Sequence, residues 1–453
     1  MTSPEREART AAGARARGRL PLEGLAEVGA PPGRDAVSLV ARQEVGRVET
    51  LLPLRRDRMA ASPFAFYRGT ALVMAADLAA TPHSGLTVQL CGDAHVANFG
   101  LFGSPERRLL FDLNDFDETL PGPFEWDLKR LVASLELAGR AIGLRRKERR
   151  RVTVRAVRSY RRSMAEFVAM SDLDVWYSSA DVEEATRLAR ATQEAARATQ
   201  RVAAQARRRT QLRSLARLSE VHEGTRRFVA DPPLVQPLAH LQATGTVGAD
   251  AVGLTRLIDD YRASLQPDRR RLLSGYTVVD VALKVVGVGS VGTRCWILLL
   301  QGVDSDDALV LQAKEASASV LEPFLGASGY AQHGERVVQG QRLMQASSDL
   351  MLGWQRGGGG TGERDYYVRQ LHDWKGGVDV GALRPEGLLG YGRLCAWVLA
   401  RAHARSGDRF AVAGYLGADA TADEALADFA AAYADRAERD HAAFVASPAP
   451  PAG

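Results

Sequence analysis

The chain has 453 residues, of which 46% are apolar and 25% charged, with a formal net charge of +5 and a pI near 9.2. These ordinary globular proportions exclude a chain that is disordered throughout. The length exceeds the usual limit for a single hydrophobic core, so we expect two lobes with a ligand-binding cleft between them.

The three cysteines, Cys91, Cys295 and Cys395, lie far apart and match no metal-binding spacing, so neither a disulfide framework nor a zinc site is expected. No apolar stretch is long enough to span a bilayer, and the N-terminus lacks the apolar segment of a secretion signal. We therefore expect a cytoplasmic protein with no membrane contact. The arginine runs at 145–151 and 207–209 lack interleaved aromatic residues, so we interpret them as solvated helix faces and expect no nucleic-acid binding.

The chain divides by composition and period into five segments. Residues 1–35 lack sustained apolar periodicity and predict a flexible N-terminal segment, and 446–453 predict a flexible tail. Residues 36–270 are mainly of helical period and predict a helical lobe that also holds two polar loops. Residues 271–375 predict a β-rich lobe, and 376–445 predict helices that complete the helical lobe.

Within the helical lobe, residues 86–90 alternate as a strand does, a polar loop follows at 91–100, and a short apolar run at 109–111 precedes an acidic loop. Pro121-Gly-Pro123 predicts a turn, and a long helical region begins at Trp126.

In the β-rich lobe, strands are expected within 276–300 and at 309–314, in an antiparallel meander. A helix is expected over 336–352, a glycine-rich loop at 357–362 and a strand at 366–371. The remainder, from about residue 388, is predicted to be helical.

Two polar loops carry the residues that suggest chemistry. Cys91-Gly-Asp-Ala-His-Val-Ala-Asn98 places one Asp and one Asn in the first loop, and Asp112 follows Asp93 by nineteen positions, after a short strand. Phosphoryl transfer needs a carboxylate to orient or deprotonate the attacking hydroxyl, and oxygen ligands that hold magnesium on the phosphates. The two loops supply both kinds of group.

These loops resemble the catalytic and metal loops of the aminoglycoside phosphotransferase and choline kinase branch of the protein-kinase-like fold. The resemblance implies that Asp93 is the base, that Asn98 and Asp112 are magnesium ligands, and that Trp126-Asp127-Leu128 begins the helix after the metal loop. The chain departs from that branch at Cys91, where histidine is usual.

Further acidic residues follow in the metal loop. Asp115 is a candidate second or replacement ligand, ranked below Asp112, and we interpret Asp117 and Glu118 as loop or substrate contacts. His95 is expected to fix the loop through a hydrogen bond more than to act in chemistry. Arg68 and Arg130, with the cluster His403, Arg405 and Asp408, are candidate substrate or phosphate contacts, with ion pairs between helices as the preferred interpretation.

A kinase-like enzyme also needs a glycine-rich hairpin whose backbone approaches phosphates and a lysine on a nearby strand. Gly287, Gly289, Ser290 and Gly292 form such a hairpin, and Lys314 lies on the strand that follows. We expect Glu335, in preference to Glu322, to be the acidic partner of Lys314. An exposed lysine on an ordinary strand is the alternative.

This lobe follows the catalytic loop, whereas in kinases it precedes it. We therefore predict an α+β, two-lobed protein-kinase-like fold in circularly permuted order, in which the residues from 391 to 405 form a helix beneath the catalytic loop. In the alternative, residues 276–320 are an unrelated β-domain.

Residues 40–440 further resemble domain-of-unknown-function family 2252, a bacterial family of uncharacterised proteins, through Phe66-Tyr-Arg-Gly69, Phe111-Asp-Leu-Asn-Asp-Phe-Asp-Glu-Thr119 and Gly334-Glu-Arg-Val-Val-Gln-Gly-Gln-Arg342. That resemblance implies no established activity.

The function predicted is an ATP- and Mg²⁺-dependent phosphotransferase that acts on a hydroxyl of an unidentified small molecule or protein. Two alternatives remain open: transfer of AMP on the same fold, and a non-catalytic pseudokinase-like module that binds a nucleotide or a partner.

Overall fold

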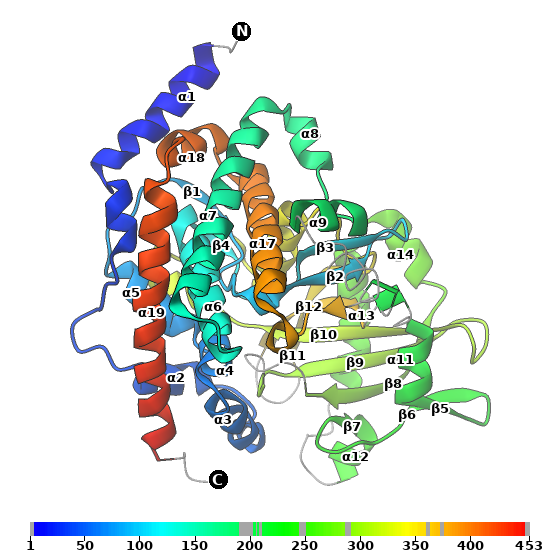
Figure 1. Cartoon of the computed structure of the whole chain (residues 1–453). Coiled ribbons are helices and arrows are strands. Elements are labelled where there is room, and N and C mark those ends of the chain that lie inside the picture. Colours follow the sequence, from blue (N-terminus) through cyan, green and yellow to red (C-terminus); the bar gives the residue numbers. More distant parts are fainter. Residues whose placement is uncertain are drawn as a thin grey trace.

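Long helices form the core of one half of the molecule. α6 (Phe124–Ala141), α7 (Arg146–Ala169), α17 (Pro385–Ser406) and α19 (Thr421–Ala446) pack against one another in this computed structural model (Figure 1). The residues that the structure describes are 4–189, 203–204, 206–207, 211–243, 251–285, 291–358, 363–371 and 376–448.

α6 is the central helix, and it buries every residue from Phe124 to Gly139. Its apolar side chains fill the core, but Asp127 and Arg130 are buried beside them. Buried charges are stable in proteins only when they are paired or hydrogen-bonded. Asp127 and Arg130 of α6 therefore need hydrogen-bond or ion-pair partners, and the neighbouring loop at 91–100 supplies them.

The N-terminal segment docks on these helices, so the prediction of a flexible segment over 1–35 is wrong for residues 4–35. α1 (Pro4–Arg15) packs against α18 (Arg409–Leu416), and Arg9 Nε donates to Asp408 at 3.0 Å. The segment that follows places Leu20, Leu22 and Leu25 in the main core. These three leucines stand among polar residues and form no periodic pattern, so the sequence does not predict an ordered element there. The segment is ordered because the leucines are buried against helices that lie far away in the chain.

Short elements connect the N-terminal segment to the first polar loop. They are η1 (Ala16–Gly18), η2 (Leu22–Ala26), α2 (Ala36–Glu44), η3 (Glu49–Leu51), α3 (Leu52–Ala60), α4 (Pro63–Arg68) and α5 (Ala71–Ala79).

Small strands lie between the helices and frame the two polar loops. β2 (Phe99–Gly103) pairs with β3 (Leu109–Leu113) and β13 (Gly376–Gly377), and β1 (Thr87–Leu90) pairs with β4 (Leu120–Pro123). The turn predicted at 121–123 is therefore wrong. In the described residues β4 pairs with β1 alone, so β4 is an edge strand. Proline has no backbone N–H to donate, and an edge strand tolerates it on the side that faces away from the partner strand.

The other half of the molecule is an antiparallel sheet. In the described residues it has six strands in the order β11-β12-β10-β9-β8-β7. Their bounds are β7 (Val235–Pro237), β8 (Thr277–Lys284), β9 (Cys295–Gln301), β10 (Ala308–Ala316), β11 (Gly353–Gly358) and β12 (Glu363–Gln370). The chain is thus an α+β protein with antiparallel sheets.

Both faces of the central strands are buried. Trp296, Leu298 and Leu300 pack on one face with Tyr261, while Ile297 and Leu299 pack on the other. Alternate residues of a strand point to opposite faces, so this apolar run needs cover on both. Residues 211–273 supply much of it, through α11 (Gln211–Leu218), β5 (Ser219–His222), β6 (Thr225–Phe228), α12 (Leu238–Ala243), α13 (Ala251–Ser264) and α14 (Pro267–Leu273).

The predicted boundary at residue 270 is therefore wrong, because the described residues within 211–270 pack with the sheet and include three strands. The remaining elements are η4 (Val96–Asn98), α8 (Asp172–Tyr177), α9 (Val182–Ala189), α15 (Glu322–Leu325), α16 (His333–Met344) and η5 (Val380–Ala382). α16 is shorter than the predicted helix over 336–352. In the described residues, no helix has the length and apolar character needed to cross a membrane.

The docking of the N-terminal segment predicts a stability effect. Leu25 is fully buried, so Leu25→Ala is expected to lower the free energy of unfolding by about 2–5 kcal/mol. Val303 is 93% exposed, and Val303→Ala should change it by less than about 0.5 kcal/mol. Urea unfolding of both variants measures the difference, and equal losses would contradict the docking.

Candidate functional site

The acidic loop, residues 112–119, lies where the sheet meets the helices. Its first two residues are the last two of β3, and its Phe116 is buried in the main core, so the carboxylates on either side of Phe116 are held in fixed positions. Asp115, Asp117 and Glu118 are partly exposed and line a common pocket.

Lys314 connects the sheet to this loop. It lies on β10 and is 4% exposed, and its Nζ donates to Asp117 Oδ2 and lies 3.8 Å from Asp115 Oδ1. Tyr367 of the neighbouring strand β12 donates its hydroxyl to Asp117 Oδ1 at 2.8 Å. Two segments 197 positions apart in the chain therefore meet at one carboxylate.

The charges in this group shift one another's pKa values. Burial acts to lower the pKa of Lys314, but Asp115 and Asp117 together raise it well above its ordinary value. Burial acts to raise the pKa of Asp117, and the Lys314 charge with the two hydrogen bonds outweighs it and lowers that pKa. For Asp115, burial and the nearby Asp117 charge raise the pKa. The group therefore keeps a charged lysine in contact with an ionised Asp117.

Side chains of two helices hydrogen-bond to the backbone of the polar loop at 91–100. Asp127 of α6 accepts from the backbone N–H groups of Cys91 and Gly92, at 2.8 and 3.0 Å. Tyr391 of α17 donates its hydroxyl to the carbonyl oxygens of Val96 and Phe99. Gly92 has φ +83 and lies against the backbone of Glu118, so only glycine fits there.

This support fixes the position of Asp93. Asn98 Nδ2 donates to the backbone carbonyl of Asp93 at 2.7 Å, and Arg130 Nε donates to Asp93 Oδ1 at 2.7 Å. Burial raises the pKa of Asp93, and the Arg130 charge offsets part of that rise. One carboxylate oxygen is therefore held by Arg130, while Asp93 remains part of the pocket wall.

His95 lies beside Asp93 without a close contact. Its Nε2 is 3.8 Å from Asp93 Oδ2, and its Nδ1 has no hydrogen-bond partner in the described part of the chain. Burial, with the charges of Arg130 and Arg68, lowers the pKa of His95 well below its ordinary value. His95 is therefore neutral.

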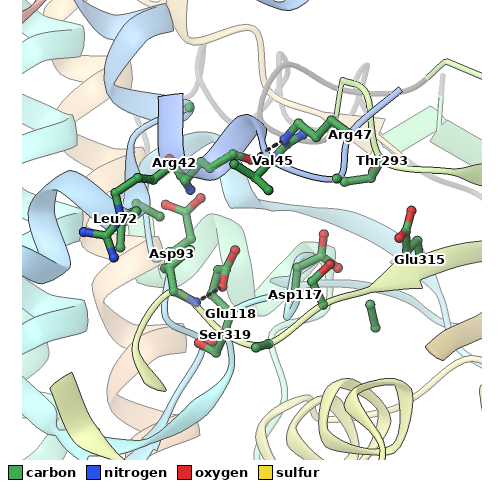
Figure 2. Close-up of a pocket in the computed structure, with 18 of the residues that line it drawn as sticks. Arg42, Val45, Arg47, Leu72, Asp93, Asp117, Glu118, Thr293, Glu315 and Ser319 are labelled. Carbon is green, nitrogen blue, oxygen red and sulfur yellow. Dashed lines mark hydrogen bonds between the residues drawn. The ribbon is translucent and has the colours of Figure 1, made fainter. Parts of the chain in front are cut away.

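A pocket of about 490 Å³ opens between these groups and the segment after α2. Figure 2 shows Asp93, Asp117 and Glu118 on one side of it and Val45 and Arg47 on the other. The described lining residues are Arg42, Gln43, Val45, Gly46, Arg47, Arg68, Gly69, Ala71, Leu72, Asp93, Asp115, Asp117, Glu118, Thr293, Glu315, Ala316, Ser317, Ala318, Ser319, Val320, Pro323 and Arg364.

Glu118 ties the acidic loop to the chain that leaves β10. Its Oε2 accepts from the backbone N–H of Val320 at 2.7 Å, and its carbonyl accepts from the Ser319 hydroxyl at 2.8 Å. Burial raises the pKa of Glu118 to about 7, although the hydrogen bond from Val320 opposes the rise.

Asp112 does not belong to the pocket. It is 1% exposed, and Arg401 Nη2 donates to both of its carboxylate oxygens, at 2.7 and 2.8 Å. The backbone N–H of Ala346 donates to it as well, at 2.8 Å. Both carboxylate oxygens of Asp112 already accept hydrogen bonds. The structure therefore favours Asp115 over Asp112 as a metal ligand, which reverses the predicted ranking.

Asp115 fits the requirements of a metal ligand better than Asp112. It lines the pocket, its side chain is 37% exposed, and its Oδ2 accepts no hydrogen bond from the described residues. Those residues contain no group of three His, Cys, Asp or Glu side chains able to hold a metal ion together. Mg²⁺ commonly uses one or two carboxylates with phosphates and water, and Asp115 can supply one of them. Both oxygens of Asp117 already accept hydrogen bonds, from Lys314 and Tyr367.

The acidic partner of Lys314 differs from the predicted one. Lys314 contacts the carboxylates of Asp117 and Asp115. Glu335 lies in the first turn of α16, and Glu322 lies 3.9 Å from Arg336 Nε. Both predicted partners follow Lys314 in the chain, whereas Asp117 precedes it by 197 positions.

The predicted glycine hairpin is described only in part. Gly287, Gly289 and Ser290 lie outside the described residues. Gly292 has φ +90, and its carbonyl accepts from the backbone N–H of Val48 at 2.8 Å, beside Arg47. The end of the hairpin thus contacts the segment that covers the pocket.

Arg68 lines the pocket near Asp93. Its Nε is buried and has no hydrogen-bond partner in the described part of the chain. Arg130, by contrast, is fully engaged: it pairs with Asp93, donates to the carbonyl of Tyr67 at 2.8 Å and stacks over the Tyr67 ring. Arg68 is therefore the one of the two that remains able to bind a ligand.

A family model described as "Uncharacterized protein conserved in bacteria", DUF2252, matches residues 47–447. No curated protein matches the chain, and no solved structure does.

The raised pKa of Glu118 predicts how stability depends on pH. Its pKa is about 7 in the folded protein and about 4.5 ordinarily, so between these values the folded state binds more protons than the unfolded state. The free energy of unfolding therefore falls as pH rises through that window. Glu118→Gln removes this titration, so wild type should lose stability relative to the variant between about pH 5 and 7.

Urea unfolding at several pH values measures this difference. The exposed Glu106 provides the control, because Glu106→Gln removes the same charge outside the pocket. A difference between wild type and Glu118→Gln that stays constant across the window would contradict the assignment.

Proposed function

We propose that this chain, which belongs to the DUF2252 family of uncharacterised bacterial proteins, is an ATP- and Mg²⁺-dependent phosphotransferase. The observation that carries the proposal is the contact of Lys314 with Asp117 and Asp115 in the wall of a pocket that Asp93 also lines. Phosphoryl transfer uses this combination: a cation for the phosphates, oxygen ligands for magnesium and a carboxylate for the acceptor.

The arrangement of elements supports a two-lobed, kinase-like fold in permuted order. Lys314 lies on an inner strand of an antiparallel sheet, and α16 follows that strand. The loop with Asp93 and the acidic loop come from the helical half, earlier in the chain. A permuted connection keeps such a site intact, because the function depends on which groups meet in space and not on their order.

In the proposed reaction, Lys314 and Arg68 bind phosphate oxygens of ATP. The contact of Lys314 with Asp117 keeps the ammonium charged and holds it behind a carboxylate that lines the pocket. Asp115 would hold Mg²⁺ through Oδ2, which accepts no hydrogen bond from the described residues. The predicted ligand Asn98 is not among the lining residues, and its Nδ2 holds the Asp93 carbonyl instead. The magnesium ion would supply charge neutralisation on the phosphates.

Asp93 would orient the acceptor hydroxyl and take its proton. Arg130 holds Oδ1, which directs the acceptor toward Oδ2. Because burial raises the pKa of Asp93, its carboxylate is a stronger base than an exposed aspartate. Neutral His95 beside it adds no positive charge that would weaken that base.

Nucleotide binding is expected to depend on Asp115. Mg²⁺-ATP binds only the folded state, so it should raise the thermal midpoint of wild type by about 2–5 °C at saturating concentration. Asp115→Asn is expected to abolish most of the rise, because the amide is a weaker magnesium ligand than the carboxylate. Asp304→Asn, in the hairpin between β9 and β10, should leave it unchanged. No rise in wild type would count against a nucleotide site.

Transfer is expected to depend on Asp93 as the base. Asp93→Asn preserves an oxygen for Arg130 but cannot take a proton, so conversion of ATP to ADP should fall by about 10²–10⁴-fold. The thermal shift with Mg²⁺-ATP should persist in this variant. Mass spectrometry of the products identifies the group transferred: ADP indicates phosphoryl transfer, whereas pyrophosphate with an AMP adduct would contradict the proposal in favour of nucleotidyl transfer.

A further inference from the structure

A second pocket lies on the helical half, on a seam formed by α7, α9 and α17, which pack side by side (Figure 1). Its volume is about 130 Å³, and among the described residues it shares no lining residue with the pocket beside Lys314. It lies outside the site proposed for the transfer reaction.

The lining of this second pocket is strongly basic. Five arginines from the three helices converge on it, with a single carboxylate, Glu166. The arginines are Arg155, Arg158, Arg162, Arg187 and Arg393. On α7 they recur at intervals of three or four residues, which places them along one face of the helix.

The charges of this group are only partly balanced. Arg158 Nε donates to Asp423 at 3.2 Å, and Arg187 pairs with Glu184. Arg155 and Arg162 have no ion pair or hydrogen bond in the described part of the chain. Like charges that line one small pocket repel one another, and salt screens the repulsion incompletely at separations below about 8 Å. An anion would remove that repulsion.

The geometry points to a binding site for a compact oligophosphate. Each guanidinium group presents paired N–H donors that match the oxygens of a phosphate group. Several guanidinium groups around one small pocket can therefore bind adjacent phosphate groups. Trp397, 7% exposed, contributes an apolar wall. We propose that this pocket binds a di- or triphosphate group, carried by a nucleotide or by an inorganic chain.

The test is calorimetric titration of the full-length protein with inorganic triphosphate in the absence of Mg²⁺. Arg155→Gln/Arg162→Gln alters two exposed side chains, so its thermal midpoint should match wild type while its affinity for triphosphate falls by at least about tenfold. Arg146→Gln/Lys147→Gln removes the same charge from exposed positions at the start of α7 and should bind as wild type does. Arg68→Gln, in the other pocket, should retain this binding as well.

Three results would overturn the proposal. The first is equal affinity of wild type and Arg155→Gln/Arg162→Gln. The second is equal weakening in the Arg146→Gln/Lys147→Gln control, which would indicate a diffuse basic surface. A single-stranded oligonucleotide that binds through Arg155 and Arg162 more tightly than triphosphate would also overturn it, in favour of nucleic acid. Comparison of ATP with inorganic triphosphate, again without Mg²⁺, separates a nucleotide from an inorganic ligand.

Discussion

The contact between Lys314 and Asp117 is the interaction on which the rest of the candidate site depends. A charged lysine that is almost fully buried requires a partner, and removal of one member of such a pair typically costs about 3–5 kcal/mol. Arg336 reinforces the same junction by donating to the carbonyl oxygens of Asp117, Thr119 and Ser317. Together these bonds fix the position of the sheet relative to the helical half, so the pocket beside Asp117 has a fixed shape.

The acidic loop shows how neighbouring carboxylates acquire separate tasks. Asp112 is closed off by Arg401 and Ala346, Asp117 is held by Lys314 and Tyr367, and Glu118 caps the backbone at Val320. Asp115 Oδ2 and Glu118 Oε1 accept no hydrogen bond from the described residues. Structural pairing of Asp112 and Asp117 therefore leaves the oxygens of Asp115 and Glu118 for a metal or a substrate.

The sequence was sufficient for features that depend on local pattern and insufficient for those that depend on distant partners. Alternation predicted β1, an apolar run predicted β10, and the spacing of polar residues identified the loops with Asp93 and Asp115. Nothing local distinguishes Asp112, whose role is set by Arg401, 289 positions away, or shows that Asp127 supports the loop at Cys91. The docking of Leu25 likewise follows from helices at the other end of the chain.

The central claim is that the segment with Lys314 and the loops with Asp93 and Asp115 form one nucleotide site. A crystal structure of the protein with Mg²⁺ and a non-hydrolysable ATP analogue tests it most directly. The account predicts phosphate oxygens within hydrogen-bonding distance of Lys314 Nζ, magnesium on Asp115 and the terminal phosphate facing Asp93. A nucleotide bound away from Lys314, or a pocket that stays empty at saturating concentration, would contradict it.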